Sequence, residues 1–137
     1  MTASRSTQIS AIFLRLALAV TMLSAVADRF GFWGTRSSRG NWQNFERYTA
    51  NLTFFLPAFL QVFSAYAATF FEIVLSLLLL AGVQLKWTAL ATGILLFLFA
   101  GAMSIALGPK APLDYSVWVG SAAAFSLAFS RNNPVNL

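Results

Sequence analysis

The sequence contains no cysteine and no histidine. The chain therefore forms no disulfide and offers no thiolate or imidazole ligand to an iron–sulfur cluster, a haem or a copper ion. Thiol redox chemistry is excluded for the same reason, and no metal site is predicted. Any electron chemistry would need a cofactor held by other groups, or a redox partner.

Charge is also scarce, with 9% of the residues charged and 58% hydrophobic. Soluble domains are about 25% charged, and a soluble chain of 137 residues could not bury this much apolar surface. The net charge of +5 comes from basic residues that lie between apolar runs, where they would face lipid head groups rather than nucleic acid. The composition predicts an integral membrane protein made of one domain, residues 1–137.

Four apolar runs have close to the ~20 residues that a membrane helix requires. They cover residues 9–27, 58–82, 87–107 and 112–130. The connections at 84–86 and 108–111 are short, so neighbouring helices should be antiparallel. The predicted fold class is an all-α membrane protein, an antiparallel four-transmembrane-helix bundle.

The first connection, residues 28–54, is long and rich in aromatic side chains. From Asn41, a plausible helix cap, one helical face of this loop carries Trp42, Phe45, Thr49 and Leu52. This spacing predicts a short helix lying in the membrane interface. Two interpretations stay open, an aromatic anchor in the head-group region and a lid over a binding site.

A carboxylate, Glu72, lies inside the apolar run "TFFEIVLSLLLLAG". Helical spacing places it on an inward polar stripe made of Gln61, Thr69, Glu72 and Ser76. Arg15 lies ~9 Å from the predicted start of the first helix, and Glu72 ~15 Å from the predicted end of the antiparallel second one. We therefore expect an Arg15–Glu72 ion pair. The pair either fixes the helix register or forms a polar site that a ligand or proton reaches.

A second polar cluster is expected at the other side of the membrane. Asp28 and Arg29 end the first helix, while Lys110 and Asp114 flank the start of the fourth. Asp28 is expected to pair with Lys110 or with an arginine of the long loop. Aromatic side chains that could stack on a ligand ring, or anchor the chain in the interface, are Trp33, Trp42, Tyr66 and Tyr115, and Tyr48 is a further candidate of the loop site.

The order of these motifs resembles the DoxX family of small membrane proteins. The stretches that carry the likeness are "LRLALAVTMLSAVADRFGFWG", "NWQNFERYTANLTFFLP", "FEIVLSLLLLAG" and "KAPLDYSV". The resemblance implies a four-helix fold, a polar pair at Arg15 and Glu72, and an association with quinone-linked oxidoreduction. Ser76 stands where the family pattern would have glycine. The absence of cysteine excludes the chemistry of the similarly shaped vitamin K epoxide reductases.

The resemblance favours a quinone-interacting subunit or partner of a membrane oxidoreductase in the bacterial cytoplasmic membrane. The implied cofactor is a non-covalent quinone, and the implied partners are another protein subunit or a second copy of the chain. The alternative is a non-enzymatic membrane anchor or assembly partner, with the long loop as its docking surface. Transport of a small molecule or proton is a third hypothesis.

Overall fold

The computed structural model describes residues 5–34 and 41–129, and the regular structure within them is helical throughout. The helices are α1 (Arg5–Arg29), α2 (Trp42–Leu52), α3 (Ala58–Ala81), α4 (Leu85–Leu107), α5 (Lys110–Asp114) and α6 (Val117–Ala128). Among the described residues, α1, α3 and α4 are long enough and apolar enough to cross a membrane. This agrees with the predicted all-α membrane protein.

The fourth predicted span is broken. Instead of one helix over 112–130, the chain forms α5 and α6, separated by Tyr115 and Ser116. Ser116 has the left-handed conformation (φ 57°, ψ 31°), which a right-handed helix cannot continue through. The 12 residues of α6 extend only ~18 Å, less than the ~30 Å core of a bilayer. The prediction of one continuous fourth helix is therefore wrong.

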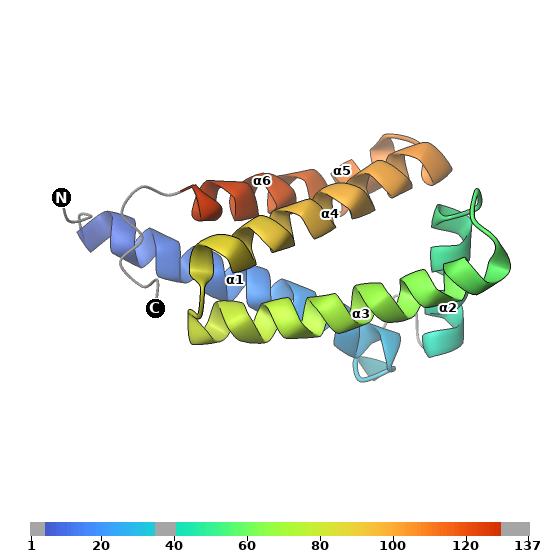
Figure 1. The fold of residues 1–137 in the computed structure, drawn as a ribbon, viewed down its shortest axis with the longest axis horizontal. Helices are drawn as coiled ribbons and strands as arrows, with labels where there is room; N and C mark the ends of the chain where they lie inside the picture. The colour runs from blue at the N-terminus through green and yellow to red at the C-terminus, as the bar shows by residue number, and fades with distance from the viewer. Residues whose placement is uncertain (1–4, 35–40, 130–137) are drawn as a thin grey trace.

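The helices associate as two pairs, α1 with α3 and α4 with α6. Figure 1 shows the pairs close together where α3 turns into α4 and farther apart towards α2. The buried core lies at the narrow end, where Leu18 of α1, Leu79 of α3 and Leu127 of α6 belong to one cluster. At the wide end, α2 packs against α1, α3 and α4. The arrangement is a wedge that α2 partly closes.

Small residues allow α4 and α6 to approach closely. A Cβ atom on Gly93 of α4 would lie 2.8 Å from the ring of Phe125 in α6. The Ser121 hydroxyl donates a hydrogen bond to the Gly93 carbonyl (2.8 Å), which ties the two backbones together. Close contact through small side chains is a common way for membrane helices to associate.

The short helix predicted in the long loop is found as α2, while its place in the membrane interface stays a prediction. The Asn41 side chain accepts a hydrogen bond from the Asn44 amide (2.9 Å) and so caps the helix. Phe45, Thr49 and Leu52 on its predicted inner face are buried. The turn after α2 is fixed by Gln61 of α3, whose amide donates to the carbonyls of Thr53 and Leu56.

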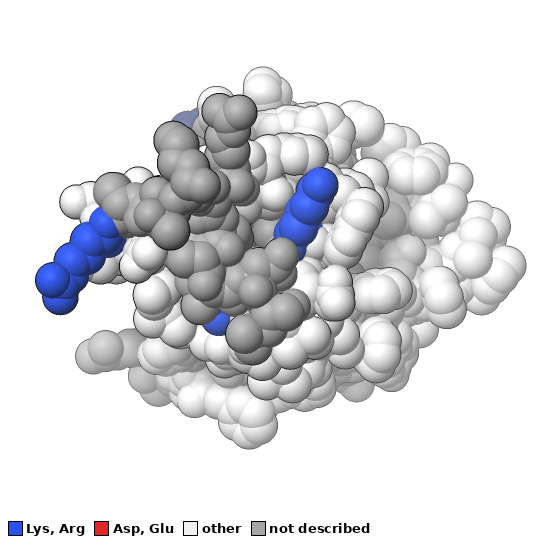
Figure 2. Space-filling model, turned by 60° about the vertical axis from the view of Figure 1, so that its left-hand side comes forward, with Lys and Arg blue, Asp and Glu red and all other residues white. Residues whose placement is uncertain are grey.

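The end of the molecule where α1 begins carries basic side chains. Arg5 starts α1, and Lys86 lies in the first turn of α4. Figure 2 shows this end with basic side chains and, among its described residues, no acidic ones in view. Basic groups at this level suit contact with anionic lipid head groups.

Candidate functional site

Glu72 forms its ion pair with Arg29, the last residue of α1. Arg29 Nη1 lies 2.5 Å from Glu72 Oε2, and both side chains are buried. The same Nη1 atom donates a hydrogen bond to the Thr69 hydroxyl (2.9 Å), one turn away on α3. The predicted Arg15–Glu72 ion pair is therefore wrong, and the buried partner of Glu72 is Arg29.

Arg15 instead stabilises the end of α3. Its Nε donates to the Leu79 carbonyl (3.0 Å) and its Nη2 to the Leu80 carbonyl (3.3 Å). Carbonyls in the last turn of a helix lack partners within the helix, and a cation there also complements the helix dipole. These contacts explain the burial of Arg15 without any ligand.

The pairing was mispredicted because the start of α1 was assumed to lie level with the end of α3. In the structure α1 begins at Arg5, four residues before the predicted start, and it extends beyond the end of α3 (Figure 1). Residues level with Glu72 consequently lie farther along α1 than Arg15.

An aromatic side chain of α2 covers the ion pair. The Arg29 Cζ atom lies 3.9 Å from the centroid of the Phe45 ring, a distance typical of a cation–π contact. Glu72 Oε2 is enclosed against the Arg29 guanidinium.

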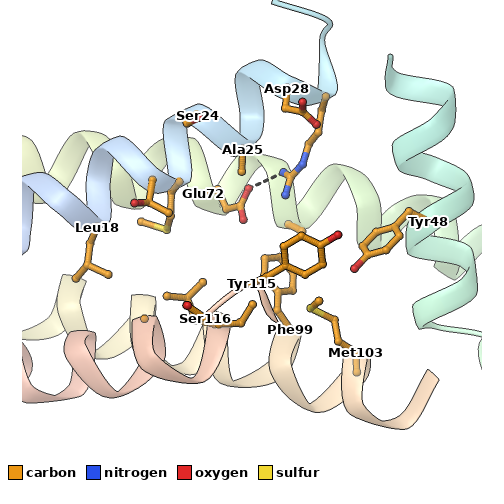
Figure 3. A pocket seen from close by; sticks show the side chains of 18 of the residues that line it. Leu18, Ser24, Ala25, Asp28, Tyr48, Glu72, Phe99, Met103, Tyr115 and Ser116 are labelled. Carbon is orange, nitrogen blue, oxygen red and sulfur yellow. Dashed lines mark ion pairs between the residues drawn. The ribbon is translucent and has the colours of Figure 1, made fainter. Parts of the chain in front are cut away.

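A cavity of about 760 Å³ lies beside this pair, between the two helix pairs and α2. Figure 3 shows Glu72 reaching from α3, with Tyr48 of α2 and the Tyr115–Ser116 break on other sides of the space. The lining is mostly apolar, and its charged members are Asp28, Arg29 and Glu72. This composition of the cavity wall suits an apolar molecule that carries a few polar atoms.

The structure brings six of the predicted site residues together around the cavity: Asp28, Arg29, Trp33, Tyr48, Glu72 and Tyr115. The Trp33 indole donates to the carbonyl and the hydroxyl of Ser24 (3.1 Å each), which holds its ring at the wall. The residues come from two clusters that had been predicted at opposite sides of the membrane. They meet because Arg29, at the end of α1, reaches Glu72.

Other predicted residues lie away from the cavity. The Ser76 hydroxyl donates to the Glu72 carbonyl within α3, and the Trp42 ring packs against Phe30 and Tyr66. Lys110 pairs with Asp114 in α5 (2.7 Å) rather than with Asp28. That hydrogen bond raises the pKa of the exposed Lys110 ammonium. These contacts are structural.

Most of the other wall residues, Phe99 and Met103 among them, were not predicted as site residues. Phe99 and Met103 lie four residues apart on α4 and both line the cavity. Their spacing places them on one helical face, but an apolar face of a membrane helix fits lipid equally well. Within the described ranges 5–34 and 41–129, carboxylates form no group of three that could hold a metal ion.

No curated protein and no solved structure matches the chain. The sequence model of the family "Methylamine utilisation protein MauE" matches residues 6–114, from the start of α1 to the end of α5. This match corrects the predicted resemblance to the DoxX family, which rested on apolar helical motifs of low specificity. The chain is an integral membrane protein, and it belongs to the MauE family of methylamine utilisation proteins.

Proposed function

We propose that the chain is a membrane-embedded accessory protein of methylamine utilisation and binds a lipid-soluble quinone in its cavity. Family membership supports the accessory role. The proposal of a quinone ligand rests on one observation, a buried Arg29–Glu72 pair at the wall of a mostly apolar cavity. Ionisable residues inside a membrane protein commonly mark a functional site, because their burial is costly.

The size of the cavity suits this class of ligand. Small-molecule sites usually measure about 300–1,000 Å³ and combine apolar walls with a few polar groups. The cavity falls in this range at about 760 Å³. Phe45, Tyr48, Phe99 and Tyr115 supply ring faces and edges against which a flat quinone could pack.

The polar groups match the two redox forms of a quinone. A quinone oxygen accepts hydrogen bonds, and Arg29 carries five N–H donors on a permanently charged group. A quinol hydroxyl donates, and the Glu72 carboxylate at the cavity wall is an acceptor. Because Arg29 and Glu72 lie side by side, either form would find a partner at the same place in the cavity.

The test is equilibrium binding of an isoprenoid benzoquinone and of its reduced quinol to the purified full chain in detergent. The wild type is expected to bind saturably. Glu72→Gln removes the charge that a hydroxyl would meet and should weaken quinol binding about tenfold, the size of a hydrogen bond to a charged group. Asp114→Asn, a matched change at an exposed carboxylate outside the cavity, should bind like the wild type.

Growth on methylamine supplies the biological readout. In a strain lacking the gene, the wild type and Asp114→Asn should restore growth, while Glu72→Gln at equal membrane abundance should restore it poorly. A wild-type protein that binds no quinone saturably would overturn the proposed ligand. Full rescue of growth by Glu72→Gln would show that the Arg29–Glu72 ion pair is not needed for the function.

A further inference from the structure

We infer that the cavity opens sideways into the lipid between α1 and α6, and that this opening holds the apolar tail of the bound quinone. The inference rests on the proposed function and adds to it the route of entry and the placement of the tail. We use "α1–α6 gap" for the opening bordered by Ala17 and Thr21 of α1 and by Val119 and Gly120 of α6.

The two helices that border the gap meet at one end only. Near the narrow end of the wedge, Ala124 and Leu127 of α6 share a buried core with Ala11 and Leu18 of α1. One to two turns earlier on α6, Val119 and Gly120 line the cavity instead. The separation of α1 from α6 therefore arises from the divergence of the two helix pairs (Figure 1).

The other wide side of the wedge is covered. Between α3 and α4 lies α2, which packs against both helices and also against α1. Between α2 and α6, by contrast, the described residues make no such packing contact. The divergence of the two helix pairs would leave an opening on each side of the wedge. The opening between α3 and α4 is closed by α2, and the opening between α1 and α6 is the α1–α6 gap.

Several residues of the gap line the cavity and are also exposed on the outside of the molecule. Ala17, Thr21 and Val119 have both properties, and Val119 is 68% exposed. Large hydrophobic neighbours on the same helix, such as Phe13 and Val20, are exposed as well. The medium outside the gap is therefore hydrocarbon, so a molecule that enters there must be soluble in lipid.

The cavity has a polar end and an apolar end. Its wall on α1 runs from Leu14 to Arg29, a distance of about 22 Å along the helix. The charges lie at the Arg29 end, whereas the wall near Leu14 and Ala17 is hydrocarbon. A ligand with a polar ring and a long apolar tail matches this polarity along its whole length, which a small water-soluble amine does not.

The test narrows the gap and compares two probes, an isoprenoid-tailed benzoquinone and the same ring without a tail. Thr21→Phe places a bulky ring in the gap at an exposed position. It should weaken binding of the tailed probe at least tenfold and of the tailless ring less than twofold. Val20→Phe, one residue away, is exposed but does not line the cavity, and it should change neither affinity. Thr21→Val, which keeps the size, should bind both probes like the wild type.

Two results would overturn the inference while leaving the proposed function intact. One is a wild type that binds the tailed and tailless rings equally well. The other is an equal loss of affinity for both probes in the Thr21→Phe variant. If phospholipid displaces the tailed probe from the gap without affecting the tailless ring, the gap holds a lipid acyl chain rather than the quinone tail. Failure of the wild type to bind either probe would instead overturn the proposed function.

Discussion

Two arginines of α1 are buried for different reasons. Arg15 hydrogen-bonds two backbone carbonyls at the end of α3, whereas Arg29 faces Glu72 and Thr69. The first arrangement needs no other charge, but the second buries two charges that depend on each other. Removing one partner of such a pair strands the other and typically costs about 3–5 kcal/mol.

This difference predicts the outcome of a double-mutant cycle. Arg29→Leu and Glu72→Leu should each lower the thermal stability of the detergent-solubilised protein. The double variant should recover part of the loss, since no charge is left stranded. Arg15→Leu combined with Glu72→Leu should give additive losses, since these side chains have different partners. Additive losses at Arg29 and Glu72 would contradict the ion pair.

At the residue scale, the sequence predicted which side chains are buried better than which of them meet. The burial of Arg15 and Glu72 was expected and is found. The axial offset between α1 and α3 was not predictable, because no local pattern encodes it. Glu72 and the actual acceptor Leu79 are seven residues apart, so the error corresponds to about 10 Å along the helix.

The elements were predicted well where a local signal exists. Pro57 precedes α3, Gly82 ends it in the left-handed conformation, and Asn41 caps α2. The break between α5 and α6 has no such signal, because its left-handed residue is a serine rather than a glycine. The strained residue, Ser116, lies at the cavity wall.

A glycine at the break should relieve this strain. Ser116 has φ 57°, a conformation that costs an ordinary residue roughly 1–2 kcal/mol and a glycine little. Ser116→Gly is therefore expected to stabilise the protein by about 1 kcal/mol, measured as a rise in its thermal midpoint in detergent. Ser104→Gly, in the last turn of α4, should instead lower the stability slightly, because glycine is the weaker helix former. A loss of stability in Ser116→Gly would contradict the role of strain.

The molecule as a whole is a wedge whose wide end depends on α2. Phe45 connects that helix to Arg29, and Trp42 packs on Tyr66 of α3. The three long helices were predictable from their apolar runs, but the wedge was not, because divergence of helix pairs depends on packing far apart in the sequence. The contact of Phe45 with Arg29 fits the lid hypothesis for the long loop, and both roles predicted for that loop stay predictions.

Weakening the contact of α2 with Arg29 should loosen the wide end alone. Phe45→Ala is expected to speed hydrogen exchange in residues 42–52 while the amides of α4 near Gly93 stay protected, because the α4–α6 contact lies elsewhere. Phe54→Ala, at a 60% exposed ring after α2, should leave the exchange of 42–52 unchanged. Equal exchange in Phe45→Ala and the wild type would argue against the lid.

The ring of Phe45 over Arg29 also sets the local dielectric. With the ring in place, the effective dielectric constant around Arg29 and Glu72 is low. The two charges therefore attract each other several-fold more strongly than they would in water. If α2 moved away and water entered, that attraction would be screened, and a polar ligand would compete for either charge at a lower cost. The Phe45 side chain, which keeps water from the Arg29–Glu72 pair, would thus also control the access of a ligand to that pair.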